Sequence, residues 1–325
     1  MKAILCRKLG GPETLELAEI DARKPGPGEV LVRVAVVGLN FFDTLMLAGK
    51  YQFRPELPFS PGAECAGRIE AIGEGVTQWR VGDRVASFPG HGCCREEIVV
   101  RADRLLRVPE GVSDEQAAGL IVTYGTSLHA LKNRARLKAG ETLAVLGAAG
   151  GVGLAAVEIG HAMGARVIAC ASSPEKLALA AEHGADLTLD YAARDLKEGL
   201  RELTKGRGVD VIYDPVGGDL AEPALRAIAW QGRYLVVGFA AGSIPKIPLN
   251  LALLKGCDIQ GVFWGSFVER EPATHRANMD RIFAWTKEGK LSAHAHGVFP
   301  LSETAAALGV LARREAQGKV LVRVD

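Results

Sequence analysis

The first third of the chain consists of short apolar runs separated by turn residues. The longest run, EVLVRVAVVGLN at 29–40, is rich in valine, and shorter runs of this kind follow at 67–76 and 82–88. The turns between runs are rich in glycine and proline, as in KPGPGE at 24–29 and PFSPGAE at 58–64. Short β-branched runs bounded by such turns predict strands, so the chain is expected to begin with a β-rich domain.

The pattern changes near residue 112. Segment 113–137 has a helical pattern, with Ser113 as a plausible N-cap and acidic Asp114 and Glu115 in the first turn. Apolar runs then alternate with helical segments such as 174–184 and 221–232; the runs lie at 142–147, 165–171, 186–191, 209–216, 233–239 and 258–264. This alternation predicts a doubly wound α/β domain, with a parallel sheet covered on both faces, at about 122–264.

The C-terminal tail has a helical pattern at 274–291 and a strand pattern, KVLVRVD, at 319–325. A terminal strand needs a sheet to join. We therefore expect the tail to return to the β-rich N-terminal domain.

Composition restricts the class of protein. The 325 residues are 48% hydrophobic and 24% charged, with a formal net charge of +1, which is typical of a soluble globular chain. The scattered basic residues favour neither a nucleic-acid nor a membrane partner. Because no apolar run reaches spanning length and no signal peptide is recognisable, we expect a cytoplasmic protein. The six cysteines form no CxxC pair and are expected to be free thiols, adjacent Cys93 and Cys94 included.

The run at 142–147 leads into a glycine-rich turn. Its spacing, Ala148-x-Gly150-x-x-Gly153, is a variant of the dinucleotide-binding fingerprint and encloses Gly151 and Val152. A small first residue permits the tight turn, the second position lets backbone approach a pyrophosphate, and the third permits close helix–strand packing. An ordinary tight turn is the alternative. The preceding strand and following helix favour a cofactor site.

The end of the next predicted strand bears on which dinucleotide binds. Enzymes that prefer NAD usually carry an acidic residue there to hold the ribose 2′-hydroxyl, whereas this chain has Ala171, Ser172 and Ser173. Ser172 and Lys176 offer a hydrogen-bond donor and a cation for a 2′-phosphate. The alternative is that Lys176 is an ordinary exposed helix residue. The combination favours NADPH.

Over nearly its whole length the sequence resembles the zinc-independent quinone oxidoreductases, related to zeta-crystallin, of the medium-chain dehydrogenase/reductase superfamily. The motifs that carry the resemblance are GLNFFDTLMLAGKY at 38–51, PFSPGAECAGRIEAIGEGV at 58–76, GDRV at 82–85, TYGTSLHAL at 123–131, LGAAGGVG at 146–153, ASSPEKL at 171–177, DPVGG at 214–218 and GK at 318–319. The resemblance implies a GroES-like catalytic domain from both chain ends, 1–121 and 265–325, around a Rossmann NADPH-binding domain at 122–264. It also implies a homodimer.

The resemblance further implies that no metal takes part. Zinc-bearing relatives carry ligands at positions where this chain has Asn40, Ala63 and Val122. None of these three side chains is a typical zinc ligand in proteins. Hydride transfer to an already electrophilic acceptor is then the easier chemistry.

Site residues follow from the same resemblance, position by position. Asn40, Tyr51 and Thr126 match residues near the nicotinamide and substrate, and we expect them to form the catalytic set. Asp43 and Glu64 are expected to hold loops or neighbouring charges. The remaining predicted cofactor contacts are Tyr191 and Arg314 around the adenine ribose phosphate, and Gly238, Phe239, Phe263 and Trp264 on the nicotinamide side.

The resulting hypothesis is hydride transfer from NADPH to a small-molecule quinone or enone. Within enzymes, the alternative is reduction of an enoyl thioester or 2-alkenal. Outside enzymes, it is an NADPH-binding structural or RNA-binding protein. A near-zero net charge without a basic aromatic stripe disfavours RNA binding.

Overall fold

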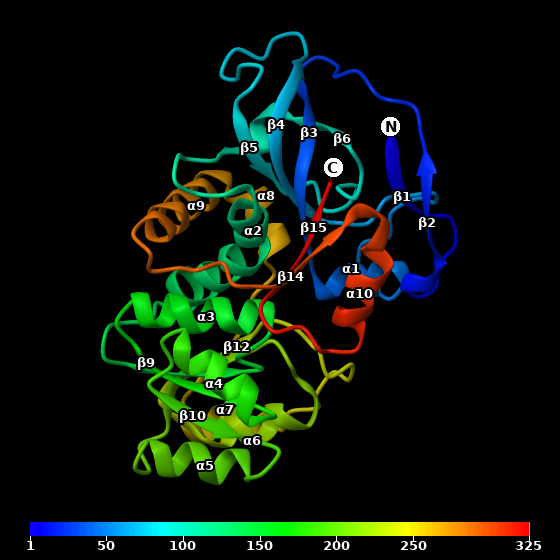
Figure 1. The fold of residues 1–325 in the computed structure, drawn as a ribbon. Coiled ribbons are helices and arrows are strands. Elements are labelled where there is room, and N and C mark those ends of the chain that lie inside the picture. The colour runs from blue at the N-terminus through cyan, green and yellow to red at the C-terminus, as the bar shows by residue number, and fades with distance from the viewer. Residues whose placement is uncertain (325) are drawn as a thin grey trace. The chain divides into compact units, whose positions relative to one another are not determined.

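The computed structural model describes residues 1–324, and the chain divides into two compact units (Figure 1). Unit 1 comprises Met1–Val122 and the C-terminal part from Arg281, whereas unit 2 comprises Thr123–Asp280. Helix α2 (Asp114–Leu128) runs across the first division. Both ends of the chain therefore belong to unit 1.

Unit 1 is built on a mixed sheet in the order β14-β15-β3-β4-β5-β7, with β6 pairing to β3. Its strands are β3 (Glu29–Leu39), β4 (Glu64–Ile72), β5 (Arg84–Ser87), β6 (Glu97–Arg101), β7 (Leu105–Arg107), β14 (Ala295–Pro300) and β15 (Lys319–Arg323). Strand β15 pairs antiparallel with β3, placing Val320 opposite Leu39 (red beside blue in Figure 1). The predicted return of the C-terminal strand to the N-terminal sheet is confirmed.

Short elements complete unit 1. They are β1 (Lys2–Cys6), β2 (Leu15–Glu19), α1 (Phe41–Leu47), α10 (Thr304–Ala312) and the 3₁₀ turns η1 (Pro12–Thr14), η2 (Ala102–Arg104) and η5 (Leu301–Glu303). Strands β1 and β2 form an antiparallel pair, and Cys6 bridges to Phe59. Helices α1 and α10 contact each other.

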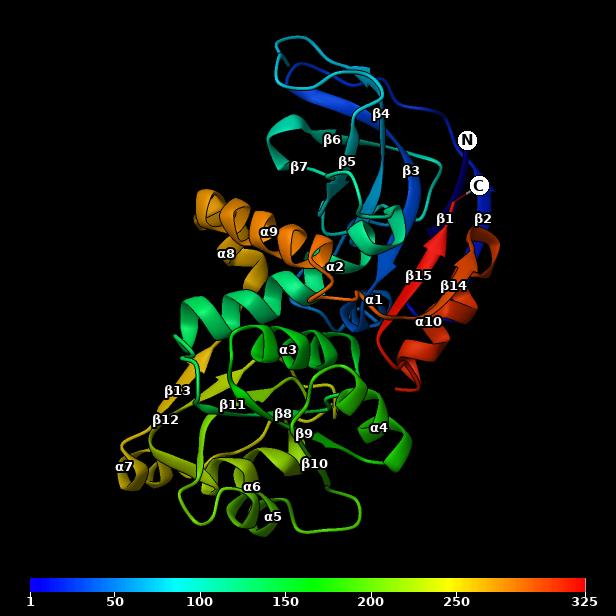
Figure 2. The same cartoon turned by 60° about the vertical axis from the view of Figure 1, so that its left-hand side comes forward.

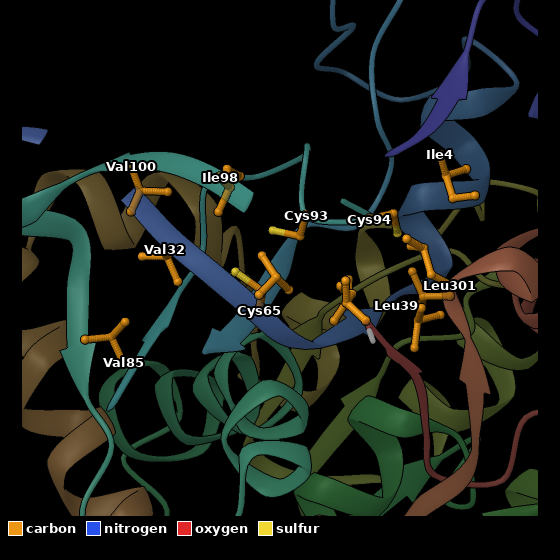
Figure 3. Packing of buried hydrophobic residues seen from close by; sticks show 14 of the residues in the cluster. Ile4, Val32, Leu39, Cys65, Val85, Cys93, Cys94, Ile98, Val100 and Leu301 are labelled. Carbon is orange, nitrogen blue, oxygen red and sulfur yellow. The ribbon is translucent and has the colours of Figure 1, made fainter. Parts of the chain in front are cut away.

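The core of unit 1 contains cysteines as well as aliphatic side chains (Figure 3). Figure 3 shows Cys65 on β4 facing Cys93, with Cys94 beside them. A hydrogen bond joins Cys65 and Cys93, and burial raises the pKa of Cys93 and Cys94 well above the usual value for a thiol. All six cysteines are buried free thiols, as expected. Because thiols react as thiolates, Cys93 and Cys94 are core residues of low reactivity.

Unit 2 is built on a six-stranded, wholly parallel sheet in the order β10-β9-β8-β11-β12-β13. Its strands are β8 (Thr142–Leu146), β9 (Arg166–Ala171), β10 (Leu187–Asp190), β11 (Val209–Asp214), β12 (Ile228–Val236) and β13 (Asp258–Gly261). The order reverses between β8 and β11, which is the doubly wound topology predicted from the alternating pattern. The predicted fold class is confirmed.

Helices cover both faces of this sheet (Figure 2). They are α3 (Gly151–Ala162), α4 (Pro174–Glu182), α5 (Leu196–Leu203), α6 (Ala221–Arg226) and α7 (Asn250–Lys255), with the 3₁₀ turn η4 (Gly218–Leu220) before α6. Side chains of α5, α6 and α7 form a core with alternate sheet residues such as Ala144 and Leu146. On the other face, Gly160 of α3 packs on Leu143 and Val167. The central strand β8 is therefore buried on both sides.

The predicted helix at 221–232 is wrong in its second half. Helix α6 ends at Arg226, and β12 begins at Ile228, which pairs with Val209 of β11. Gln231 then has a left-handed φ of 59° before Gly232. Pairing in the sheet outweighs the helical propensity of this apolar segment, because strand preference depends mainly on tertiary context.

The predicted boundary at 264 differs from the division at 280. Helices α8 (Trp264–Arg270) and α9 (Pro272–Lys287) follow β13, and their residues up to 280 group with unit 2. Trp264 packs on Gly125 of α2, and the Asn278 side chain donates to Asn133 at 2.8 Å in the π-helical turn η3 (His129–Arg134). No helix within residues 1–324 is both long and apolar enough to cross a membrane.

Candidate functional site

The glycine-rich turn joins the carboxyl end of β8 to the start of α3. Gly147 has a left-handed φ of 60°, and Gly150 is the N-cap of α3 and has no side chain to cap the first turn. A Cβ on Gly153 would lie 2.2 Å from the Gly147 carbonyl oxygen, whereas one on Gly150 would meet its nearest atom at 3.5 Å. Gly153 is therefore required by the fold, and Gly150 leaves space beside the backbone. This is the cradle that a dinucleotide pyrophosphate needs, so the turn fits the expected cofactor.

A hydrogen-bond network with residues of α2 and β11 supports this turn. The Ser127 hydroxyl on α2 donates to the Val152 carbonyl at 3.0 Å and lies 2.8 Å from the hydroxyl of Tyr213 on β11. Thr126, one of the predicted catalytic residues, is the neighbour of Ser127 and is 8% exposed. The sequence analysis did not single out Ser127, although it lies in the TYGTSLHAL motif, nor Tyr213, which directly precedes the DPVGG motif.

At the carboxyl end of β9, two residues predicted to bind the adenine ribose phosphate come together. Ser172 is exposed directly after the strand, and its side chain hydrogen-bonds Tyr191, which follows β10. Burial nevertheless raises the Tyr191 pKa, so the phenol stays protonated at neutral pH. Ser173 caps α4 by accepting from the Lys176 amide at 3.4 Å, which places Lys176 in the first helical turn. No carboxylate stands at 171–173.

The DPVGG segment lies at the carboxyl end of β11 and is ordered by Asp214. This carboxylate accepts from the amides of Val216 and Gly217, both at 2.8 Å, and from the Tyr234 hydroxyl. Burial raises the Asp214 pKa, while these three donors lower it. Asp214 is a loop-ordering residue that the sequence reasoning missed, although its motif was recognised.

The residues expected on the nicotinamide side follow β12 and β13. Gly238 and Phe239 come after β12, and Phe239 packs on Gly217. Phe263 is 59% exposed, whereas Trp264 is buried against Gly125 of α2. Since carboxyl ends of parallel strands meet at one edge of a sheet, these residues share an edge with the glycine turn.

In unit 1, Asn40 belongs to a buried polar cluster. It is the N-cap of α1, and its own amide donates to the Asp43 carboxylate at 2.7 Å. Its side-chain nitrogen donates to Glu64 at 2.8 Å, and its side-chain oxygen accepts from the Lys319 ammonium at 2.6 Å. The second Glu64 oxygen accepts from the Val122 amide at 2.7 Å. The carboxamide of Asn40 is thus fixed in one orientation by side chains on two other strands, Glu64 of β4 and Lys319 of β15.

The cluster does not suit a metal ion. Lys319 forms an ion pair with Glu64, and their side chains are 4% and 0% exposed. Glu64 is therefore already neutralised by an ammonium group, which would repel an added cation. The neighbouring Ala63 and Val122 offer no ligand side chain. Over the described part of the chain, no three His, Cys, Asp or Glu side chains are grouped so as to hold a metal.

The other predicted residues of unit 1 do not join this cluster. Tyr51 stacks on Phe42 with ring centroids 5.2 Å apart, and burial together with the charge of Asp43 raises its pKa. Arg314 lies exposed in the turn after α10, with a left-handed φ of 61°. Lys319 was recognised only as part of a GK motif, and no local signal pointed to its contact with Asn40, 279 positions away.

Comparison with known proteins agrees with this architecture. The model of the alcohol dehydrogenase GroES-like domain matches residues 26–110, and that of the zinc-binding dehydrogenase family matches 151–282. A quinone oxidoreductase-like protein 2 homolog of Nematostella vectensis is 39% identical, covering 99% of this chain and 88% of the relative. A quinone oxidoreductase of Pseudomonas aeruginosa is 36% identical and covers 99% of both chains.

Comparison with solved structures also finds similarity to quinone oxidoreductases. The Escherichia coli quinone oxidoreductase, crystallised in complex with NADPH, superposes with a TM-score of 0.94 at 28% identity, covering 99% of this chain and 100% of that one. Sequence and structure agree over the full length of both units, so this chain belongs to the quinone oxidoreductase family of the medium-chain dehydrogenases/reductases.

Proposed function

We propose that this protein transfers a hydride from NADPH to a quinone or a similar conjugated carbonyl compound. The observation that carries the proposal is the edge of the unit 2 sheet, where the glycine turn is followed by the Ser172–Tyr191 pair and Lys176. The turn offers backbone amides and close approach to a pyrophosphate. The strand end offers hydroxyl donors and a cation, and positions 171–173 carry no acidic residue to repel a 2′-phosphate.

The bound NADPH would supply the hydride, and the chain's own residues would position the acceptor. Because its raised pKa keeps the Tyr51 phenol protonated, Tyr51 can donate a hydrogen bond to the acceptor oxygen. Glu64 and Lys319 hold the Asn40 carboxamide, which fixes the orientation that it presents. Thr126 stays in place because Ser127 anchors that turn of α2. We assign Arg314 to the 2′-phosphate as part of the same proposal.

The test of this function is NADPH oxidation with ortho- and para-quinones, 2-alkenals and crotonyl-CoA as acceptors. We expect the quinones to give the highest kcat/KM. Tyr51→Phe keeps the stacked ring and should lower that value by about 10-fold or more, with an unchanged melting temperature. A preference for crotonyl-CoA would favour thioester reduction instead. Inactivity with every acceptor would favour a non-catalytic NADPH-binding protein.

The cofactor preference has its own test. Lys176→Ala should weaken NADPH binding by about 10-fold and leave NADH binding unchanged, because only NADPH carries the 2′-phosphate. Lys138→Ala is the matched control, since Lys138 is exposed and precedes β8 at the opposite edge of the sheet. Equal loss of affinity for both dinucleotides in Lys176→Ala would contradict the assignment.

We further propose a homodimer joined through unit 2. Strand β13 is an edge of the parallel sheet and has unpaired backbone groups. Next to it lies a set of exposed apolar side chains, the α7 patch, which comprises Trp230, Leu249, Leu253, Leu254 and Ile259. An exposed edge strand beside such a patch supports pairing with a second copy of the chain. We also infer a cytoplasmic location, supported by the six free cysteines.

A further inference from the structure

A pocket lies within unit 1 and shares no lining residue with the Asn40 cluster. Its volume is about 690 Å³, within the range of small-molecule sites. It is formed by the loop 53–59, the turn 89–92 and outward-facing residues of β3 and β6. None of its residues belongs to the Asn40–Glu64–Lys319 cluster or to the predicted site residues.

Three arginines line this pocket: Arg23, Arg54 and Arg95. Arg95 follows Cys94, and its backbone bridges to Ala3. Its side chain is partly buried, and its Nε is shut off from solvent without a hydrogen-bond partner in the described chain. Burial lowers the Arg95 pKa, as does the like charge of Arg23. A desolvated guanidinium beside a second one is costly unless an anion compensates it.

The nearby acidic residues do not provide that anion. Glu97 is paired with Arg33 at 2.9 Å, and Glu96 accepts from the Lys2 amide at 2.8 Å. Glu56 lines the pocket but is exposed and forms no ion pair within residues 1–324. The pocket therefore contains an excess of positive charge that the protein itself does not neutralise.

Part of the pocket lining is aromatic. The Phe53 ring is tilted by 46° against His91 with centroids 5.6 Å apart, and Phe59 meets His91 edge-on at 6.3 Å. Phe53 is 53% exposed, so its ring is available for contact. Burial and the Arg95 charge lower the His91 pKa, which keeps this imidazole neutral at pH 7. A flat apolar group fits against such a wall, and a planar guanidinium fits a carboxylate.

We propose that this pocket binds a small organic anion in which a carboxylate is joined to an aromatic ring. The guanidinium of Arg95 pairs with the carboxylate, and Phe53 and His91 contact the ring. The site is separate from the NADPH-dependent reaction. It does not rest on the function proposed above.

Calorimetric titration and thermal shift of the full-length protein test this site. The probes are benzoate, benzamide and inorganic phosphate, each with NADPH at saturation to block the cofactor site. We expect benzoate to bind and to raise the melting temperature. Benzamide has the same shape without the charge and should not bind. Phosphate has the charge without the ring and should bind at least about 10-fold more weakly than benzoate.

Arg95→Gln should weaken benzoate binding by about 10-fold or more while NADPH-dependent quinone reduction stays at the wild-type rate. Without a ligand, this variant should melt at a higher temperature than the wild type, because it removes an uncompensated charge. Arg313→Gln, at an exposed ion pair with Glu315 in the same unit, is the matched control and should bind benzoate normally.

Phe53→Ala is a second variant. Because Phe53 is exposed, this variant should fold even if Arg95→Gln does not. It should weaken benzoate binding and leave phosphate binding unchanged. Undiminished benzoate binding in either Arg95→Gln or Phe53→Ala would overturn the proposal. So would a wild-type protein that binds benzoate no better than benzamide, or phosphate as tightly as benzoate.

Discussion

Three charged side chains, Asp43, Glu64 and Lys319, are buried around Asn40 in unit 1. Lys319 neutralises Glu64 directly, whereas one oxygen of Asp43 has no hydrogen-bond partner in the described chain. Burial raises the Asp43 pKa to about 7, although Lys319 and the Asn40 amide act to lower it. Asp43 is therefore the residue of this cluster whose ionisation is most costly.

This raised pKa predicts a pH dependence of stability. The Asp43 carboxyl has a pKa of about 7 in the folded protein and an ordinary value of 3.8 otherwise. The folded state thus binds more protons between these pH values, so the Asp43 contribution to stability falls as pH rises from about 4 to 7. Asp43→Asn should remove this loss. It should raise the free energy of unfolding at pH 8, by at most about 4 kcal/mol, and change it little at pH 4.

Urea unfolding of wild type and Asp43→Asn at both pH values measures the effect, with Asp21→Asn at an exposed position as control. The difference between variant and wild type is the quantity to compare, since other groups titrate in both proteins. A difference that is the same at pH 4 and pH 8 would be inconsistent with a buried, raised Asp43 carboxyl.

At the scale of elements, the turn between β8 and α3 shows that its glycines have different physical roles. Gly153 is needed because the helix start approaches the Gly147 carbonyl, which leaves no room for a methyl group. Gly150 has room for one, and its place in the fingerprint instead reflects the approach of a ligand to the backbone. Alanine substitutions at Gly153 and Gly150 can therefore separate the role of the turn in helix–strand packing from its role in cofactor binding.

Gly150→Ala should keep the melting temperature near that of the wild type and weaken NADPH binding by about 10-fold or more, because the added methyl group occupies the pyrophosphate's approach. Gly153→Ala should lose about 1–3 kcal/mol of stability, because the 2.2 Å contact forces helix and strand apart. Thermal unfolding and NADPH titration of both variants give the comparison. Normal NADPH affinity in Gly150→Ala would show that the turn does not hold the pyrophosphate.

At the scale of the whole molecule, the α7 patch of unit 2 is a group of large apolar side chains that stay exposed when a single chain folds. Leu253 and Leu254 are 79% and 67% exposed on a six-residue helix next to the edge strand β13. Trp230 packs beside this helix over Gly256 and is itself 68% exposed. Large apolar side chains gathered in this way are typical of a protein–protein interface.

Leu253→Asp combined with Leu254→Asp should convert the proposed dimer to a monomer, because two desolvated carboxylates would face an apolar surface. Light scattering coupled to size-exclusion chromatography measures the mass. Val81→Asp, at a 65% exposed position in unit 1, is the control and should stay dimeric. A double variant that elutes with the wild-type mass would exclude the α7 patch as the interface.

The local sequence pattern was sufficient to predict elements where apolar residues recur regularly along the chain. The alternation of apolar runs and helices predicted the parallel sheet, and the glycine spacing predicted the turn before a helix, which in the structure is α3 and begins at Gly151. It failed at 228–232, where an apolar segment compatible with a helix joins the sheet through Ile228. Unit 2 extends to Asp280, beyond the predicted boundary at 264, and no periodicity reveals the contacts of this segment: Trp264 of α8 packs on α2, and Asn278 of α9 donates to η3.

The sequence by itself determined the fold class, the family and the position of the dinucleotide turn, since each depends on residues close together in the chain. Only the tertiary structure decided which side chains surround Asn40, that Asp214 orders the DPVGG segment, and that Arg95 lines a pocket with no ion-pair partner among residues 1–324. A residue's neighbours within a few positions indicate its local conformation and its burial where no tertiary pairing overrides the local pattern. Its charge partners and its desolvation depend on segments that can be far away in the chain, as Asn40 and Lys319 are at 279 positions apart.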